Sequence, residues 1–406
     1  MKVLLIGAGG REHALAWKLT QSSQLDELHA APGNPGIARL GECHPVRAED
    51  AEGLLDLASS LPADLVVVGP EAPLVAGVAD ELRHSGVAVF GPGQEAARIE
   101  GSKRFAKEVM QAAGVPTAAA MSMARPPCVV KVDGLAAGKG VFVCPDQGSL
   151  DAALREIARL GQPLVIEELL EGDEISLFCL ADGRNLLPLA PARDYKRIGD
   201  DDTGPNTGGM GSYSPVPGLG ASDVGELVAT VHEPVLAELA RRGCPFVGLL
   251  YAGLMLTDSG PKVLEFNCRF GDPETQSILP RLQGDLLETL AAAAHGDLRS
   301  ADVATDEQTA VTVVLAGRDY PRQGDSGTPI TGVADAETGG ALVFHAGTAT
   351  RGDQLLTNGG RVLNVTALGP SLDAARERAY NACAAISFDG MQFRRDIAGG
   401  AVKVAT

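Results

Sequence analysis

The residues best suited to chemistry lie in the segment Val263–Arg269, which reads VLEFNCR. On a β-strand alternate side chains share a face, so Glu265, Asn267 and Arg269 would project together, while Leu264 and the other apolar residues face a core. A carboxylate and an amide oxygen without histidine or cysteine suit Mg²⁺, and a nearby guanidinium can neutralise a transferring phosphoryl group. The alternative is a solvated polar face on an edge strand, although asparagine is unfavourable in strands.

A glycine-rich turn between two β-branched runs forms a second candidate, in Val129–Val143 (VVKVDGLAAGKGVFV). Lys131 and Lys139 stand at its two sides, and its glycines leave backbone N–H groups open to phosphate oxygens. The sequence has no G-x-x-x-x-G-K-[ST] motif, and a strand follows the turn where that motif would have a helix. We therefore expect a strand–loop–strand lid that closes over a nucleotide and is mobile in its absence.

A long polar, glycine-rich stretch covers residues 190–215 and contains Arg193, Lys196 and three consecutive aspartates at 200–202. Long loops in compact domains are usually functional or disordered. The charged side chains beside glycines favour a loop that a ligand orders. A solvated, flexible insert is the alternative.

The first turn, Gly7-Ala8-Gly9, resembles the start of a dinucleotide-binding fingerprint. Glu12 occupies the position of the third glycine, however, and the next strand ends in Ala31-Pro32 where an acidic ribose ligand would be expected. These departures disfavour a nicotinamide site. A phosphate at the following helix N-terminus, supported by Arg11, is one alternative, and glycines that only permit a tight turn are another.

Composition narrows the class of protein. The chain has 406 residues, of which 45% are hydrophobic and 50 are glycine, and a formal charge of −18 (34 basic minus 52 acidic residues). This charge argues against a nucleic-acid or anionic-membrane surface. Seven cysteines without CxxC spacing argue against disulfides or a zinc site and favour a reducing cytoplasm. With no signal peptide and no apolar run of membrane-spanning length, we expect a soluble α/β enzyme.

Three parts are expected in the chain. Residues 1–100 alternate apolar strands with helices, including one over Leu74–His84, which predicts a doubly wound parallel sheet. Residues 101–300 hold the lid, within about 117–180, together with a helix at Val224–Arg241 and a helix at Leu282–His295. Residues 306–406 change to short strands and one helix, Leu372–Ile386, with Ser371 as its N-cap, typical of a small mixed β/α domain.

Taken together, these features resemble the ATP-grasp ligases: two lysines before the lid (Lys103 and Lys131), the glycine-rich strand–loop–strand lid, an acidic hinge of the pattern E-E-x-x-x-x-x-E and an E-x-N metal strand. Within that superfamily the chain is similar to the phosphoribosylamine–glycine ligase (glycinamide ribonucleotide synthetase) family over residues 8–369. The matching segments are GGREHALAWK, APGNPG, VGPEAPLVAGV, EGSKRFAKEVM, VDGLAAGKGV, VIEELLEGDE, DTGPNTGGMGSYSP, GLLYAGLM, EFNCRFGDPETQ and TNGGRVLNVTALG. GPNTGGMG and EFNCRFGDPE are the most specific of them.

The resemblance implies an N-terminal domain, a central ATP-grasp domain with a small lid subdomain, and a C-terminal domain. It implies that ATP, glycine and 5-phosphoribosylamine give ADP, phosphate and glycinamide ribonucleotide through a glycyl phosphate, in purine biosynthesis. The cofactors would be ATP and Mg²⁺ or Mn²⁺. The partners would be small molecules, with no nucleic acid or membrane, and the chain would be a cytoplasmic monomer.

The resemblance also implies site residues. Those for ATP, with the lysines at its phosphates, Glu167 and Glu168 beside adenine and Glu174 at the ribose, are Lys103, Lys131, Gly134, Leu135, Ala136, Ala137, Gly138, Lys139, Gly140, Glu167, Glu168 and Glu174. Glu265 and Asn267 would hold the metal, and Arg269 and Lys131 would be catalytic. Those for glycine and 5-phosphoribosylamine are Gly9, Gly10, Arg11, Gly69, Pro70, Glu71, Asp194, Lys196, Asn206, Thr207, Gly208, Gly209, Met210 and Gly211.

Two departures from the family pattern stand out. The usual D-H-K-R reads Asp194-Tyr195-Lys196-Arg197, and a phenol with a pKa of about ten cannot replace histidine near neutrality, so Tyr195 receives no catalytic role. Only the eleven residues TAAAMSMARPP separate Pro116 from Cys128, which predicts a smaller lid. Three alternatives stay open: an ATP-grasp ligase for another acid and amine, a nicotinamide-dependent oxidoreductase, and a nucleotide-binding regulator without catalysis.

Overall fold

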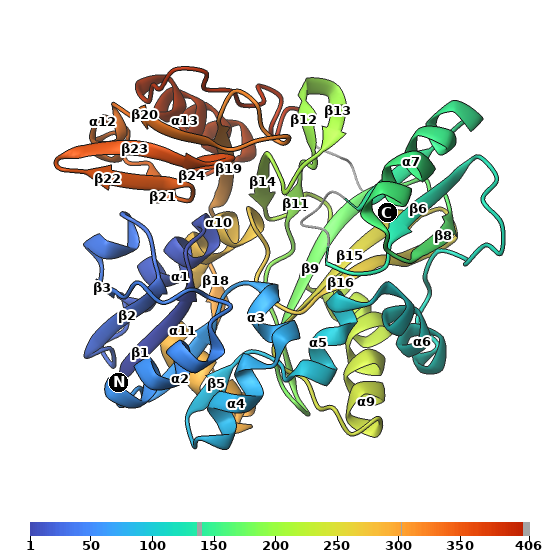
Figure 1. Cartoon of the computed structure of the whole chain (residues 1–406), viewed down its shortest axis with the longest axis horizontal. Helices are drawn as coiled ribbons and strands as arrows, with labels where there is room; N and C mark the ends of the chain where they lie inside the picture. The colour runs from blue at the N-terminus through green and yellow to red at the C-terminus, as the bar shows by residue number, and fades with distance from the viewer. Residues whose placement is uncertain (136–139, 302, 401–406) are drawn as a thin grey trace.

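The computed structural model describes residues 1–135, 140–301 and 303–400, and it confirms a mixed α/β chain with a parallel sheet at the N-terminus. Figure 1 shows the N-terminal sheet (blue) at the lower left, the C-terminal domain (red) above it and the lid (green) at the right. Four residues expected in the lid loop, Ala136, Ala137, Gly138 and Lys139, lie outside the described residues, and with them most of the segment for which mobility was expected.

Runs of leucine and β-branched residues form the parallel five-stranded N-terminal sheet, in the order β3-β2-β1-β4-β5. Its strands are β1 Lys2–Gly7, β2 Glu27–Pro32, β3 Glu42–Cys43, β4 Leu65–Val68 and β5 Ala88–Phe90. Its helices are α1 Gly10–Leu19, a 3₁₀ turn Ile37–Arg39, α2 Ala51–Ser60, α3 Glu71–Ala76, α4 Val78–His84 and α5 Gln94–Gly101. Alternate residues of β1 and β4 enter two different cores, so both faces of the sheet are covered, as predicted.

One predicted helix of this domain is broken. The apolar spacing predicted a single helix over Leu74–His84, but α3 begins earlier, at Glu71, and ends at Ala76, with Gly77 as its C-cap. Gly77 has a φ of +92°, in the left-handed region that glycine adopts without strain, and α4 starts directly after it. The glycine therefore redirects the chain between two short helices.

The lid is a small unit with its own core. It follows α6 (Lys103–Ala113) and consists of β6 Cys128–Val132, β7 Val141–Cys144, α7 Gln147–Leu160 and β8 Leu164–Glu168. The strands form an antiparallel sheet in the order β7-β6-β8, so the predicted strand–loop–strand hairpin is confirmed. Leu150, Ala153 and Ile157 of α7 pack on its inner face.

The central sheet is antiparallel, in the order β10-β9-β15-β16. Its strands are β9 Asp173–Asp182, β10 Leu186–Pro188, β15 Val247–Thr257 and β16 Gly260–Asn267. The helices in this part of the sequence are α8 Ala221–Leu227, a π-helical segment Val228–His232, α9 Glu233–Arg241, α10 Glu274–Ile278, a 3₁₀ turn Leu279–Arg281, α11 Leu286–His295 and a 3₁₀ turn Leu298–Ser300. The predicted helix Val224–Arg241 is thus interrupted by a π-helical segment, and the one predicted from Leu282 starts at Leu286, after Asp285 caps it.

The C-terminal part contains two sheets, β11-β14-β19-β24-β21 and β20-β23-β22. Their strands are β11 Arg193–Asp194, β14 Gly211–Ser214, β19 Thr309–Ala316, β20 Asp325–Pro329, β21 Leu342–His345, β22 Thr348–Arg351, β23 Gln354–Gly359 and β24 Arg361–Gly369. The helices are α12 Val333–Thr338 and α13 Leu372–Ala385. Ser371 caps α13 as predicted, its side chain accepting a hydrogen bond from the Ala374 N–H at 3.3 Å.

The stretch 190–215 differs from expectation, because it already holds short strands. β11 and β14 extend the C-terminal sheet, so residues from the middle of the sequence belong to it. The remaining short elements of the chain are β12 Arg197–Gly199, a 3₁₀ turn Asp200–Asp202, β13 Thr203–Asn206, β17 Leu282–Gln283 and β18 Ala304–Thr305. Throughout the described residues, no helix has both the length and the apolar character needed to cross a membrane.

Alanine at Gly77 tests the helix break. Replacing Gly77 by alanine should lower the free energy of unfolding by about 1–2 kcal/mol, because the left-handed conformation strains an L-residue. Space is not the cause, since a Cβ there would lie at 3.5 Å from Gln94. The matched control is Gly225→Ala inside α8, where a Cβ meets no atom within 4 Å and should stabilise by about 0.5–1 kcal/mol. Urea unfolding followed by circular dichroism measures the stability change of both variants. A stabilising effect of Gly77→Ala would contradict a helix break that depends on the left-handed conformation of Gly77.

Candidate active site

A cavity of about 270 Å³ lies where the three parts of the molecule meet. Its wall includes side chains from α5 and α6, from lid strands β6 and β8, and from β16. Arg11 of the N-terminal domain and Arg361 of β24 complete it from opposite ends of the sequence. The polar groups of this cavity are the candidates for chemistry.

A β-bulge in β16 aims the candidate metal ligands into this cavity. Gly253 of β15 pairs with Glu265, whereas the next residue, Leu254, pairs with Val263. Leu264 is therefore an extra residue with no register partner on β15. Val263 enters the core, but Leu264 lines the cavity together with Glu265. The expectation that Leu264 faces the core is therefore wrong, because strict alternation stops at the bulge.

Glu265 is an acid among cations. Burial alone would raise its pKa, but nearby positive charges outweigh burial and hold the pKa of this carboxyl below its ordinary value. These charges belong to Lys196, Lys103, Lys131 and Arg269. Asn267 lines the cavity two residues further on, and its amide oxygen accepts a hydrogen bond from the Arg269 guanidinium at 3.3 Å. An ionised carboxylate and a neutral amide oxygen, among cations that attract further anions, fit a hard divalent ion shared with phosphate.

Arg269 is held by two carboxylates from different helices. Its Nε lies 3.1 Å from Glu71 Oε2, and its Nη2 lies 3.0 Å from Glu100 Oε1. Burial lowers the pKa of Arg269, but these two carboxylates outweigh burial and raise that pKa well above its ordinary value. The guanidinium is therefore permanently charged and fixed in orientation.

The lysines at the lid share one buried carboxylate. Glu167 of β8 lies 2.7 Å from the Lys131 ammonium and 2.9 Å from the Lys107 ammonium. Lys131 also donates to the Leu264 carbonyl at 2.8 Å, which joins the lid to the bulge in β16. Lys103 enters from the start of α6, where its Nζ donates to the Gly134 carbonyl of the lid at 3.3 Å. All three lysines line the cavity.

A second cluster surrounds Lys196, which lies 3.0 Å from Asp194 and is also paired with Glu174. Burial raises the pKa of Asp194, and the pKa of Lys196 lies well above its ordinary value because the two carboxylates outweigh its burial. Tyr251 of β15 lies beside this cluster and donates from its hydroxyl to Glu274 at 2.8 Å. This corner of the cavity can hold a further polar ligand.

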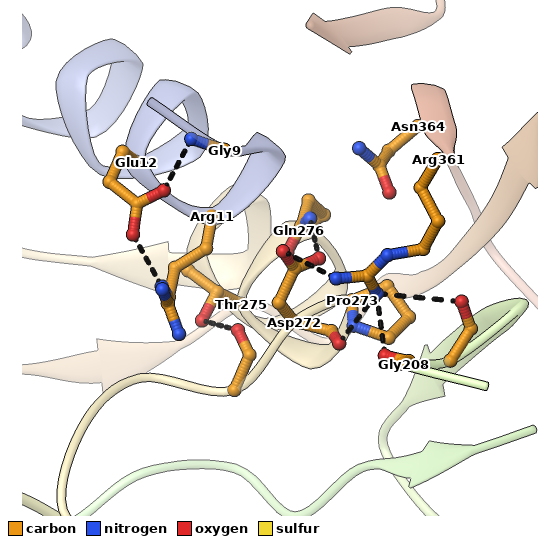
Figure 2. Close-up of polar contacts among 12 residues, drawn as sticks. Gly9, Arg11, Glu12, Gly208, Asp272, Pro273, Thr275, Gln276, Arg361 and Asn364 are labelled. Atoms are coloured by element: carbon orange, nitrogen blue, oxygen red, sulfur yellow. Dashed lines mark hydrogen bonds and ion pairs between the residues drawn. The ribbon is translucent and has the colours of Figure 1, made fainter. Parts of the chain in front are cut away.

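Figure 2 shows the junction where the N-terminal, central and C-terminal parts meet. Arg361 of β24 forms an ion pair with Asp272 at 3.0 Å and donates to the carbonyl of Gly208. Gln276 donates to the same aspartate at 2.8 Å, while the side-chain oxygens of Gln276 and Asn364 are buried with no hydrogen-bond partner among the described residues. The C-terminal domain therefore fixes the loop that precedes α10.

The turn between β1 and α1 is occupied by the side chain of Glu12 from α1 (Figure 2). Glu12 accepts a hydrogen bond from the Gly9 N–H at 2.6 Å and another from Arg11 Nε at 2.6 Å. A Cβ at Gly69 would lie only 2.3 Å from the Glu12 carboxylate. Glu12 thus fills the crevice between β1 and β4 where a dinucleotide phosphate would sit.

Of the 29 predicted site residues, 15 line the cavity: Arg11, Glu71, Lys103, Lys131, Gly134, Leu135, Gly140, Glu167, Asp194, Lys196, Thr207, Gly208, Glu265, Asn267 and Arg269. Others, although described, do not line it: Gly9, Gly10, Gly69, Pro70, Glu168, Glu174, Asn206, Gly209, Met210 and Gly211. Alternation along β8 turns Glu168 away from Glu167 and toward Lys262, at 3.1 Å. Met210 is fully buried.

Several lining residues were not predicted. Glu100, Lys107, Asp272, Glu274 and Arg361 all carry charge into the cavity. For four of these the signal was present, since Glu100 and Lys107 lie in the family segment EGSKRFAKEVM, and Asp272 and Glu274 lie in EFNCRFGDPETQ. Arg361 also lies in a matching segment, but no sequence pattern relates β24 to a loop about 90 residues earlier. Tyr195 packs away from the cavity, its hydroxyl accepting a hydrogen bond from the Ala398 N–H at 2.9 Å.

Models of one known protein family match three successive segments of the chain. Models of phosphoribosylglycinamide synthetase match with the N domain over residues 1–100, the ATP-grasp (A) domain over 101–275 and the C domain over 310–400. A phosphoribosylamine–glycine ligase of Streptomyces coelicolor is 52% identical, with 99% of each chain covered. One from Rhizobium meliloti is 47% identical, again with 99% of each chain covered.

Solved structures agree with this result. The crystal structure of a phosphoribosylamine–glycine ligase from Thermotoga maritima is 35% identical, with a TM-score of 0.85 over 98% of this chain and 100% of that one. A biotin carboxylase domain from Hydrogenobacter thermophilus, in complex with MgADP, has a TM-score of 0.70 at 17% identity, over 96% of this chain and 91% of that one. The second likeness shows a shared fold.

The pKa of Glu71 gives a test of the Arg269 contacts. Burial raises this pKa, but Arg269 and Arg11 outweigh burial and lower it from 4.5 to about 2. Because the folded-state value lies below the unfolded one, the carboxylate stabilises the fold above pH 4.5, and this stability is lost as the pH falls toward 2. Glu71→Gln should therefore lower the free energy of unfolding by up to about 3 kcal/mol at pH 7, and by about 1 kcal/mol less at pH 4.

The single tryptophan, Trp17, lies in α1 of the same domain as Glu71, so its fluorescence reports on the unfolding of that domain. Urea unfolding followed by tryptophan fluorescence at both pH values supplies the comparison. Glu81→Gln, an exposed glutamate of α4, is the matched control and should change stability little at either pH. Equal effects of the two substitutions at pH 7 would contradict the Glu71–Arg269 assignment.

Proposed function

The chain belongs to the phosphoribosylglycinamide synthetase family, and from that membership we propose how its cavity carries out the reaction. Its activity is the ATP-dependent ligation of glycine to 5-phosphoribosylamine, which forms a C–N bond in purine biosynthesis. The single observation that carries the proposal is the convergence, in one cavity, of Glu265 and Asn267 with the four cationic side chains that lower the pKa of Glu265.

A carboxylate is a poor acyl donor until it is phosphorylated. The glycine carboxylate attacks the γ-phosphorus of ATP, the bond to ADP breaks, and glycyl phosphate forms. The amine of 5-phosphoribosylamine then attacks the glycyl carbonyl carbon, a C–N bond forms, phosphate leaves and the amine loses a proton. Such chemistry needs positioning and charge neutralisation more than a covalent side chain, which agrees with a site made of fixed cations.

The nucleotide would lie between the lid and β16. Lys103 and Lys131 bind its phosphates, and the backbone of Gly134, Leu135 and Gly140 covers them. Glu167 holds Lys131 in place through their 2.7 Å ion pair. Asn206 donates to the Val141 carbonyl of β7 at 3.3 Å, so the glycine-rich stretch and the lid support each other.

Glu265 and Asn267 would hold the metal, which we propose to be Mg²⁺ or Mn²⁺. The fit rests on the chemistry of the donors, since both are hard oxygen ligands and the carboxyl stays ionised. When bound, such an ion would neutralise negative charge on the phosphates. Arg269 would stand beside the transferring phosphoryl group, in an orientation that Glu71 and Glu100 fix.

Glycine and 5-phosphoribosylamine would occupy the end of the cavity nearest the N- and C-terminal domains. Arg11, Lys196 and Arg361 present positive charge there, suited to the carboxylate of glycine and the phosphate of the ribose. Asp194, Thr207 and Gly208 are available for hydrogen bonds to the same ligands. The buried side-chain oxygens of Gln276 and Asn364, which have no hydrogen-bond partner within the described part of the chain, lie near this end (Figure 2).

We also propose that the protein acts as a cytoplasmic monomer. Support comes from the cavity, whose wall draws on all three parts of one chain, and from seven cysteines that are free in the described structure. Light scattering after size-exclusion chromatography measures the molar mass and so tests whether the protein is a monomer.

Removing the Glu265 carboxylate tests the metal assignment. Glu265→Ala should reduce kcat by at least about 100-fold, because charge neutralisation at the phosphates is lost, while the fold stays intact. Steady-state release of ADP at saturating Mg²⁺ measures the loss, and circular dichroism checks the fold. Asp258→Asn, an exposed acid in the turn of the same hairpin, is the control and should leave kcat unchanged. Normal turnover by Glu265→Ala would contradict the assignment.

Substrate dependence tests the reaction itself. ADP release should require glycine, and hydroxylamine in place of 5-phosphoribosylamine should trap glycyl hydroxamate from the activated intermediate. Other small amino acids and amines serve as controls. Turnover that is independent of glycine would indicate a different ATP-grasp ligase.

A further inference from the structure

A Glu-x-His pair occurs twice near the edge of the N-terminal sheet, as Glu27-Leu28-His29 and Glu42-Cys43-His44. The first pair lies on β2 and the second begins β3, the parallel edge strand beside it. His29 and Glu42 are register partners, and the His44 N–H continues the pairing by donating to the Ala30 carbonyl at 2.8 Å. Because residues two apart share a face of a sheet, all four side chains lie on the same side of these strands.

Three of these side chains converge on one point. His29 Nδ1 lies 3.0 Å from His44 Nε2 and 3.8 Å from Glu42 Oε2. One possible ligand atom from each of the three residues lies within 4.8 Å of the other two. Ligands about 2.0–2.1 Å from a tetrahedral ion lie roughly 3.3 Å apart, so the three atoms need to move little to share one ion.

The fourth side chain sets the tautomer of His29. Glu27 Oε2 lies 3.2 Å from His29 Nε2 and also 3.1 Å from the Lys2 ammonium. A carboxylate accepts, so His29 Nε2 carries the proton and its Nδ1 lone pair points to His44 and Glu42. A carboxylate behind a histidine ring is the arrangement that orients metal-ligating histidines and raises their basicity.

We propose that His29, His44 and Glu42 form a binding site for a divalent transition-metal ion of the Zn²⁺ type, with Glu27 as the carboxylate that orients His29. Two imidazole nitrogens and one carboxylate oxygen suit Zn²⁺, Co²⁺ or Ni²⁺ and leave one position for water. Mg²⁺ prefers oxygen ligands alone, so this site and the Glu265–Asn267 site select different ions. Glu42 supplies a negative charge to the ion directly, whereas Glu27 divides its charge between His29 and Lys2.

A bound metal ion would stabilise β3, the edge strand of the N-terminal sheet. β3 is only two residues long, and Glu42 is exposed, so few contacts hold this strand. The connection from β2 to β3 contains Asn34, whose amide donates to the Ala8 carbonyl at 2.8 Å and to the His345 carbonyl at 2.9 Å. An ion that joins β2 to β3 therefore stabilises the connection that meets both the first turn and the C-terminal domain.

Cobalt supplies a direct reporter for the test. Untagged, metal-free protein in excess Mg²⁺ should bind one equivalent of Co²⁺ with the visible absorption of a four-coordinate site, and Zn²⁺ should displace it. His44→Ala and Glu42→Ala, at half-buried and exposed positions, should each abolish the band. Glu27→Ala should weaken Co²⁺ binding by about 10–100-fold. Zn²⁺ should raise the Tm of the unsubstituted protein but not that of His44→Ala.

Two controls make the result specific. His84→Ala, an exposed histidine of α4 in the same domain, and Glu265→Ala should both retain the band. The proposal is overturned if the unsubstituted protein gives no such band, if the band survives in both His44→Ala and Glu42→Ala, or if Glu265→Ala abolishes it. None of these readouts depends on turnover, so they stay separate from the fate of the proposed reaction.

Discussion

The charge balance around Glu265 is the constraint on which the active site depends. A buried carboxylate would normally resist ionisation, but Lys103, Lys131, Lys196 and Arg269 keep it charged. So many cations around one acid leave the cavity ready for additional negative charge. A nucleotide triphosphate with a divalent ion, a glycine carboxylate and a ribose phosphate supply it. The substrates thus complete an electrostatic arrangement that the protein alone leaves open.

Several cations of the cavity are also held in position by partners from other elements. Glu71 and Glu100 fix Arg269, Glu167 fixes Lys131, and Asp272 fixes Arg361. These pairs connect helices α3 and α5 to the segment after β16, two strands of the lid to each other, and the C-terminal sheet to the loop before α10. Preorganised charges cost little reorganisation when the reaction occurs. The same contacts make the site a product of all three parts of the chain.

Local sequence patterns predicted much of this structure. Apolar runs identified the parallel sheet, the lid hairpin followed from its glycines, and the E-x-N alternation brought Glu265 and Asn267 to one cavity. The errors have physical causes. Alternation failed for Leu264 because a bulge inserts a residue, and periodicity missed the break at Gly77 because one left-handed residue redirects the chain. Arg361 was missed because only tertiary folding brings β24 to the site.

The central claim is that Glu265 and Asn267 hold the ion that accompanies the ATP phosphates. A crystal structure with Mg²⁺ and a non-hydrolysable ATP analogue tests it most directly. We predict an ion about 2.0–2.1 Å from an oxygen of each residue and from phosphate oxygens, with Lys103 and Lys131 on the same phosphates. An ion that binds the nucleotide but contacts neither Glu265 nor Asn267 would contradict the claim.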